Sequence, residues 1–262
     1  MRFSKFLFAA LATAALLSGC SKFKFTTDEK ADWTVQKFYT EAKAALDNKD
    51  WEPAIKLYQE LEARYPYGPY AEQAQIDVAF AYWKHEEPES AVAAVDRFMR
   101  LHPTHPGIDY AYYLKGLILM NEDRGFVDRW LGPGDLTERD PKANGQAFEA
   151  FRELTARFPD SRYAEDSRAR MGRLLHGLAL HDIHVARHYY NRKAYIAAIN
   201  RCKSVLENYQ HTPAAEDALG LMAMSYREMG MDQLARDSLR VLKTNYPNSN
   251  YFKKFDAKYL AG

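Results

Sequence analysis

The fold is decided by residues 215–247, which read AEDALGLMAMSYREMGMDQLARDSLRVLKTNYP. Apolar residues recur here at the spacing of one helix face, first over 215–229 and again over 231–246. Gly230 separates the two stretches, and Pro247 stops the second one. The segment therefore predicts two short amphipathic helices joined by a tight turn.

Small and large apolar residues are placed so that these two helices can pair. The small side chains of Ala223 and Ala235 stand where the helices must approach closely, and the larger Tyr226 and Leu239 stand where they interlock. We expect a helix–turn–helix unit that buries its apolar faces against its own partner helix and against neighbouring units.

The phrase that ends this unit returns along the chain. It stands at Tyr65-Pro66, His102-Pro103, Phe158-Pro159, Tyr209-Gln210 and Tyr246-Pro247. The successive intervals are 37, 56, 51 and 37 residues. A helix–turn–helix period of about 34 residues is the signature of the tetratricopeptide repeat. The sequence thus predicts an all-α solenoid of about five such units, with insertions in the two longer intervals.

The two insertions have different characters. Residues 121–140, NEDRGFVDRWLGPGDLTERD, contain a Gly-Pro-Gly loop, and long loops of this kind are usually functional or disordered. Phe126, Trp130 and Leu131 either present an apolar surface to a partner or fold back onto the scaffold. The second insertion carries no helix breaker from Arg162 to about Asn191. We expect it to lengthen one helix by roughly 25 Å and to project as a second surface.

The first residues read as a targeting segment. Arg2 and Lys5 precede the apolar run 6–17, which is too short to span a membrane. The run ends in Leu17-Ser18-Gly19-Cys20, which resembles a bacterial lipobox, and an ordinary signal peptide with a chance cysteine is the alternative. We expect a signal peptide over 1–19, a lipidated tether over 20–32 that begins at Cys20, and a superhelical domain over 33–262.

Charge and cysteine content argue against nucleic-acid binding and against a disulfide. Removal of the segment 1–19 changes the formal net charge from +1 to −1, which argues against nucleic-acid binding. Lipidation of Cys20 would leave Cys202 without a disulfide partner. Because apolar neighbours share its helical spacing, we expect Cys202 to be a small buried hydrophobic residue.

A histidine cluster is the one candidate metal site. His181, His184 and His188 lie at i, i+3 and i+7 of the predicted long helix. No glutamate stands among them in a zincin arrangement, so we expect a solvated face or a subunit contact. The sequence contains no phosphate-binding glycine loop, nucleophile elbow or paired carboxylates. We expect no catalytic residues, no metal and no cofactor.

Several connecting segments resemble one family closely. They are residues 64–70 (RYPYGPY), 97–111 (RFMRLHPTHPGIDYA), 138–141 (ERDP), 158–163 (FPDSRY), 185–190 (VARHYY) and 200–201 (NR). With the lipobox, they resemble the BamD (ComL/YfiO) family of outer-membrane lipoproteins across essentially the whole mature chain. Gln210 departs from the recurring proline. Ser21 directly after the cysteine, by resemblance to other lipoproteins, implies the periplasmic face of the outer membrane.

The resemblance implies a non-enzymatic scaffold of the outer-membrane protein assembly (Bam) machinery. Such a protein receives unfolded β-barrel precursors through their C-terminal segment and promotes their folding and insertion together with BamA. Implied partners are the periplasmic domain of BamA, other Bam lipoproteins and the outer membrane itself. The alternatives are a periplasmic adapter lipoprotein of another envelope machine, for cell-wall or pilus assembly, and a metal-dependent hydrolase built on the histidines.

The resemblance also suggests site residues. The candidates for binding the substrate peptide are Tyr67, Tyr70, Asp109, Tyr110 and Tyr113. These proline-flanked tyrosines otherwise cap and staple helix ends. Arg201 is the candidate contact to BamA, and the alternative is a surface charge without a partner.

Overall fold

The computed structural model describes residues 30–120 and 141–260, and every regular element in these ranges is helical. The predicted fold class, an all-α repeat solenoid, is confirmed. The predictions for the signal peptide, for Cys20 and for Phe126, Trp130 and Leu131 concern residues outside the described ranges.

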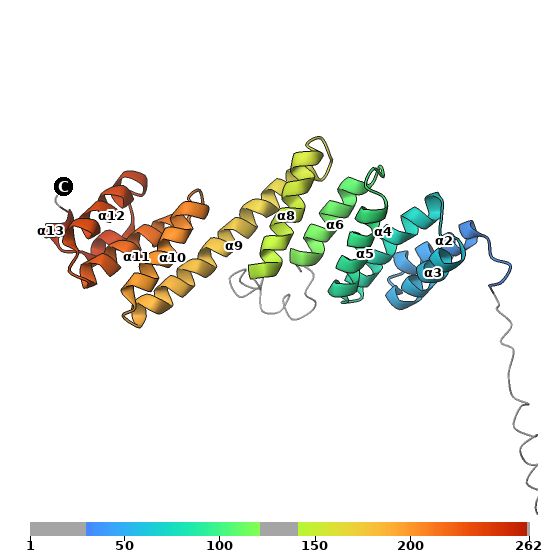
Figure 1. Ribbon diagram of the computed structural model, residues 1–262, viewed down its shortest axis with the longest axis horizontal. Coiled ribbons are helices and arrows are strands. Elements are labelled where there is room, and N and C mark those ends of the chain that lie inside the picture. Colours follow the sequence, from blue (N-terminus) through green and yellow to red (C-terminus); the bar gives the residue numbers. More distant parts are fainter. Residues whose placement is uncertain (1–29, 121–140, 261–262) are drawn as a thin grey trace, which may run out of the picture.

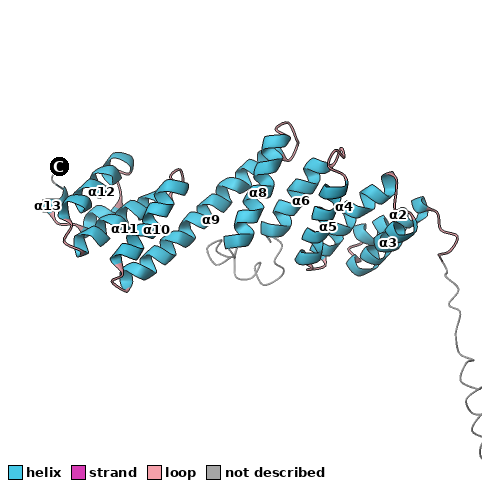
Figure 2. Cartoon of the chain, in the orientation of Figure 1, coloured by secondary structure: helices cyan, strands magenta, loops and turns pink. Residues whose placement is uncertain are grey.

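Ten α-helices of 13 residues or more form consecutive antiparallel pairs in the described ranges, and a short C-terminal segment follows them (Figures 1 and 2). The pairs are α2 (Val35–Asp47) with α3 (Trp51–Arg64), α4 (Pro69–Lys84) with α5 (Pro88–Leu101), α6 (Ile108–Met120) with α8 (Pro141–Arg157), α9 (Ala164–Asn191) with α10 (Tyr195–Asn208), and α11 (Ala214–Glu228) with α12 (Asp232–Asn245). The 3₁₀-helix η1 (Asn250–Lys254) and α13 (Ala257–Leu260) close the array. The first and last pairs lie at opposite ends of an elongated molecule.

The first helices of the pairs form one continuous layer. Beyond the contacts between consecutive helices, α2 touches α4, α4 touches α6, and α9 touches α11. Side chains on this layer, although far apart in sequence, can therefore line one common surface. In the part of the chain that is described, none of the helices combines the length and the apolar character that a membrane span requires.

The turns inside four of the units share one backbone conformation, but only one of these turns contains the glycine that would reveal it in the sequence. Four residues two positions after a first helix have positive φ, namely Lys49, Glu86, Lys193 and Gly230. In each turn the next residue donates its N–H to a carbonyl five residues earlier, as in Asp50 to Ala45 (2.9 Å). This is the Schellman C-cap, which favours glycine. Only Gly230 follows that preference, so composition alone did not reveal the other turns.

The long helix α9 is confirmed, but the prediction that it projects as a separate surface is wrong. Its first half belongs to a core in which Leu174 packs with Phe151 and Met120. Its second half contributes Ile183 to another core, together with Cys202. Both halves are thus buried against successive units, and α9 joins the two parts of the solenoid (Figure 1).

Cys202 is fully buried, as predicted for a small hydrophobic residue. Burial raises the pKa of its thiol to about 12, so the group stays neutral near pH 7. The predicted close approach in the last unit is also confirmed, because Ala223 and Ala235 are both completely buried in one core.

Gly116 marks a close contact between α6 and α8. A methyl group at this position would lie 2.4 Å from the Phe151 ring. We predict that Gly116→Ala lowers the free energy of unfolding by about 1–3 kcal/mol, the usual range for overpacking. Gly172→Ala is the matched control, since a methyl group there would meet no described atom within 4 Å, and it should stabilise α9 slightly. Urea unfolding followed by circular dichroism checks both, and equal effects would contradict the tight contact.

Candidate peptide-binding site

A cavity of about 550 Å³ opens on the layer of first helices, between α4, α6 and the start of α9. We call it the tyrosine groove. Its lining includes Gln73, Asp77, His105, Asp109, Tyr110, Arg162 and Tyr163. Its volume falls within the range of ordinary ligand sites, and it combines aromatic, acidic and cationic groups.

Helical spacing explains why these side chains converge. Gln73 and Asp77 stand one turn apart on α4, and the amide of Gln73 donates to Asp77 Oδ1 (2.9 Å). Tyr110 and Tyr113 stand at i and i+3 on α6, so their rings share one face. Tyr163 immediately precedes α9 and reaches both of them.

Three tyrosine rings form the aromatic part of the site. Tyr113 and Tyr163 stack with ring centroids 4.7 Å apart, and Tyr110 lies 5.5 Å from Tyr163. The Tyr113 hydroxyl donates to Asp166 Oδ2 (2.7 Å), and the Arg162 guanidinium bonds the Tyr163 hydroxyl. Burial raises the pKa of Tyr110 to about 12, which keeps this phenol neutral. The result is a fixed aromatic surface with a cation at its edge.

Asp77 forms the acidic floor of the groove. Its Oδ2 accepts hydrogen bonds from the hydroxyls of Tyr39 (3.0 Å) and Tyr58 (3.3 Å). Burial raises the pKa of the Asp77 carboxyl above its usual value, although these hydrogen bonds oppose the shift. Asp77 thus ties three helices together beneath the tyrosines.

Asp109 makes two hydrogen bonds within the protein, and its contact to a substrate peptide stays a prediction. Its Oδ2 accepts a hydrogen bond from the Ser161 hydroxyl (2.6 Å), and its Oδ1 accepts from the Tyr110 N–H (2.7 Å). Its side chain therefore holds the turn before α9 against α6. Asp109 lines the groove, and these contacts make it a residue that positions Tyr163 and Arg162.

The structure gathers some predicted residues and separates others. Asp109 and Tyr110 line the groove, and Tyr113 stacks on the lining residue Tyr163 without lining the cavity itself. Tyr70 lies farther along the same layer, with its ring 5.3 Å from that of Tyr39. Tyr67 is 89% exposed and lines another cavity, beside Arg97 and Leu101. Tyr67 therefore does not belong to the tyrosine groove.

Several residues of the site were not identified from the sequence, among them Arg162, Tyr163, Asp77 and Tyr39. Arg162 and Tyr163 lie in a segment that resembled the family, but nothing in its spacing separated them from an ordinary helix start. Asp77 and Tyr39 meet across 38 residues, and only the stacking of α2 on α4 brings them together. The one available signal was the Asp77 carboxylate, which stands within the otherwise apolar run 76–83 of α4.

Arg201 lies on α10 and has an intramolecular partner. Its guanidinium pairs with Asp182 (3.2 Å), which also accepts a weaker hydrogen bond from Ser204 (3.4 Å). This pair lies within the chain, so both the contact to BamA and the alternative of a surface charge without a protein partner stay predictions. About half of the Arg201 side chain remains exposed, so it can still reach a second protein.

The histidine cluster lies on the second half of α9. His184 and His188 are exposed, and His181 is partly buried. Within residues 30–120 and 141–260, no group of three or more histidine, cysteine or acidic side chains is arranged to hold a metal ion.

Known proteins of one family match this sequence along nearly its whole length. Residues 31–242 match the family model described as YfiO, outer membrane lipoprotein. The chain is 45% identical over 242 residues to outer membrane protein assembly factor BamD of Neisseria meningitidis serogroup B. This match covers 91% of the chain and 90% of that protein. The factor of the same name from Vibrio cholerae is 35% identical, over 90% of this chain and 97% of its own. A solved structure of MamA protein matches with a TM-score of 0.35 and 14% identity, over 84% of this chain and 88% of its own.

Proposed function

Because the chain belongs to the YfiO family of outer membrane lipoproteins, we propose that it is a scaffold of the outer-membrane protein assembly (Bam) complex. It receives unfolded β-barrel precursors and promotes their folding and insertion together with BamA. It works by binding and positioning, without catalysis. The relatives named assembly factor BamD support this function over that of an adapter in cell-wall or pilus assembly.

The proposal includes a lipid anchor at Cys20, on the periplasmic face of the outer membrane. The segment 1–19 is then the signal peptide, 20–32 is the tether, and 33–262 is the superhelical domain. The lipobox-like sequence Leu17-Ser18-Gly19-Cys20 supports the anchor. These residues precede the described part of the chain.

The tyrosine groove is our proposed receiving site. The observation that carries it is the stacked pair Tyr113–Tyr163 with the cation of Arg162 at its edge. A precursor segment that ends in an aromatic residue and a carboxylate would place its ring on the tyrosines and its carboxylate on Arg162. Tyr70 extends the same aromatic surface toward α2.

The carboxylate contact gives a direct test. We predict that a ten-residue peptide ending in phenylalanine binds about fivefold more tightly as the free acid than as the amide, since one exposed ion pair contributes up to about 1 kcal/mol. Arg162→Gln should abolish this difference. Arg168→Gln, which removes another exposed cation from the start of α9, should retain it. Fluorescence anisotropy with the full chain measures all six combinations of protein and peptide, and a difference that survives Arg162→Gln would refute the role of Arg162.

A test of the contact to BamA must account for the ion pair between Arg201 and Asp182. We predict that Arg201→Gln lowers co-purification of the BamA periplasmic domain at least about threefold, because an interfacial charge is lost. Asp182→Asn also breaks the internal pair but leaves the cation free, and it should retain or increase co-purification. Equal losses in the two variants would mean that the ion pair only maintains the structure.

Depletion in cells separates the proposed function from the alternative. Loss of the protein should lower the levels of folded outer-membrane barrels. If barrel levels remain normal while cell-wall or pilus assembly fails, the chain is an adapter of another envelope machine.

A further inference from the structure

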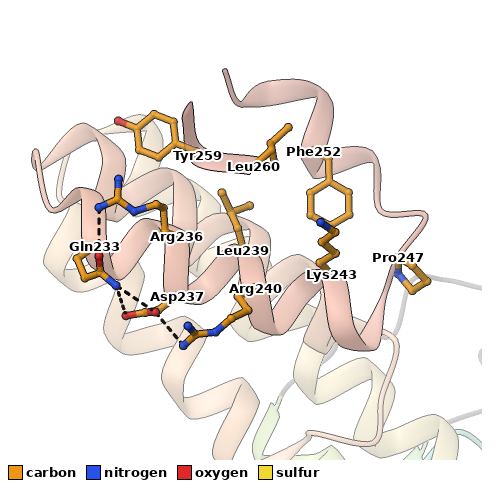
Figure 3. A pocket seen from close by; sticks show the side chains of 10 residues that line it. All are labelled: Gln233, Arg236, Asp237, Leu239, Arg240, Lys243, Pro247, Phe252, Tyr259 and Leu260. Atoms are coloured by element: carbon orange, nitrogen blue, oxygen red, sulfur yellow. Dashed lines mark hydrogen bonds and ion pairs between the residues drawn. The ribbon is translucent and has the colours of Figure 1, made fainter. Parts of the chain in front are cut away.

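A second cavity, of about 450 Å³, lies at the far end of the solenoid, between α12 and the C-terminal segment (Figure 3). We call it the C-terminal cavity. Leu239, Phe252, Tyr259 and Leu260 supply its apolar surface. It is separate from the tyrosine groove, which α4, α6 and the start of α9 form.

The wall of this cavity is held in place by defined contacts. The Tyr259 hydroxyl donates to Asp232 Oδ1 (2.7 Å), which fixes α13 to the start of α12. The Arg227 guanidinium donates to the Lys254 carbonyl (2.6 Å), and the Tyr251 hydroxyl donates to Asp217 Oδ1 (2.5 Å). The cavity is therefore preformed, which reduces the entropy that a ligand must lose on binding.

Positive charge dominates one side of the cavity. Arg236, Arg240 and Lys243 face it from α12, and Asp237 is the one carboxylate among the described residues of the lining. Asp237 pairs with Arg240 (2.9 Å), while Arg236 bonds the amide oxygen of Gln233 (3.1 Å). The Lys243 ammonium group makes no hydrogen bond or ion pair with any residue that the structure describes. Arg236 and Lys243 thus remain uncompensated by a described carboxylate, one on each side of Leu239 (Figure 3).

The distance between Arg236 and Lys243 along α12 fits two acidic residues of an extended peptide segment. Arg236 and Lys243 are seven positions apart on α12, which corresponds to about 10 Å along the axis. In an extended segment, residues i and i+4 lie about 13 Å apart on one face, and residue i+2 points the same way between them. The flexible arms of Arg236 and Lys243 can span the difference.

We propose that the C-terminal cavity binds an extended segment of a partner protein with the pattern acidic–x–aromatic–x–acidic. The aromatic side chain enters the apolar surface of Leu239, Phe252 and Leu260. The two carboxylates pair with Arg236 and Lys243. The partner is an acidic, aromatic-containing segment, and the surface is independent of Arg201 and of the tyrosine groove.

Synthetic peptides test the proposal with the full chain. The probe is fluorescein-labelled Gly-Ser-Glu-Ser-Phe-Ser-Glu-Ser-Gly with an amidated end, so that the carboxylate preference of the tyrosine groove does not contribute. We expect saturable binding that weakens about tenfold or more when both glutamates become glutamine, or when phenylalanine becomes alanine. Binding that is indifferent to these changes would overturn the proposal.

Protein variants locate the binding. Arg236→Gln with Lys243→Gln should weaken the probe about tenfold, whereas the matched control Arg192→Gln with Lys203→Gln removes two exposed cations elsewhere and should change little. Equal weakening in both double variants would mean non-specific charge attraction and would overturn the proposal. A photoreactive phenylalanine in the probe should label residues 236–260, and labelling of the tyrosine groove would contradict it. If sedimentation instead shows dimers that the Arg236/Lys243 variant abolishes, the occupant is a second copy of this chain and the proposal fails.

Discussion

Replacement of both Tyr113 and Tyr163 by alanine is expected to weaken binding of a phenylalanine-ended peptide by roughly a hundredfold. Tyr163 lines the tyrosine groove and the Tyr113 ring supports it by stacking, and truncation of a central aromatic anchor commonly costs about 2 kcal/mol or more. The measurement is fluorescence anisotropy with the full chain and the free-acid peptide. The effect is larger than that of Arg162, because the rings bury apolar surface whereas the cation is exposed.

Two controls separate binding from structure in this experiment. Replacement of both tyrosines by phenylalanine keeps the rings but removes the hydroxyls bonded to Asp166 and to Arg162, so most of the affinity should remain. Tyr67→Ala removes a highly exposed tyrosine outside the groove and should leave the affinity unchanged. If Tyr67→Ala weakens the peptide as much as the groove variant does, the site lies elsewhere.

Leu178→Pro is expected to have the largest effect on stability, a loss of more than about 3 kcal/mol in the free energy of unfolding. Position 178 lies in the middle of the 28-residue helix α9, where proline removes a backbone hydrogen bond and clashes with the preceding turn. Because the two halves of α9 are buried in different cores, we also expect unfolding to separate into two transitions. Urea denaturation followed by circular dichroism, together with limited proteolysis near residue 178, measures both effects.

The control for this prediction is Leu178→Ala, which truncates the same partly buried side chain but preserves the helix. It should cost much less and leave one transition. A single cooperative transition in Leu178→Pro would contradict the view that α9 couples the two parts of the solenoid.

Much of the fold could be predicted from the sequence because the repeat signals are local. The apolar spacing and Gly230 placed the last helix pair within a residue or two of α11 and α12. The uninterrupted pattern from Arg162 likewise predicted α9. The position of α9 in the array was predicted wrongly. An amphipathic pattern shows that a face is buried, but it does not show which neighbours cover each half.

The site was less accessible to prediction because it depends on contacts between units. Tyr110 and Tyr113 were identified through a family resemblance, and about 50 residues of chain separate them from Tyr163, so no spacing rule connects them. Asp77 meets Tyr58 across 19 residues and Tyr39 across 38. The exposed position of Tyr67 depends on the direction in which the turn before α4 leaves Pro66, and the sequence motif alone does not specify it.

The central claim is that the tyrosine groove receives barrel precursors, and photo-crosslinking in cells tests it most directly. A photoreactive phenylalanine is placed at Tyr110 or Tyr163 in the groove, and at Tyr67 or Ile196 on exposed surfaces outside it. Barrel precursors are then labelled during synthesis. We predict crosslinks from the groove positions to the C-terminal segments of the precursors, and few from Tyr67 or Ile196. Crosslinks that are as strong at Tyr67 or Ile196 as at Tyr110 and Tyr163 would contradict the claim.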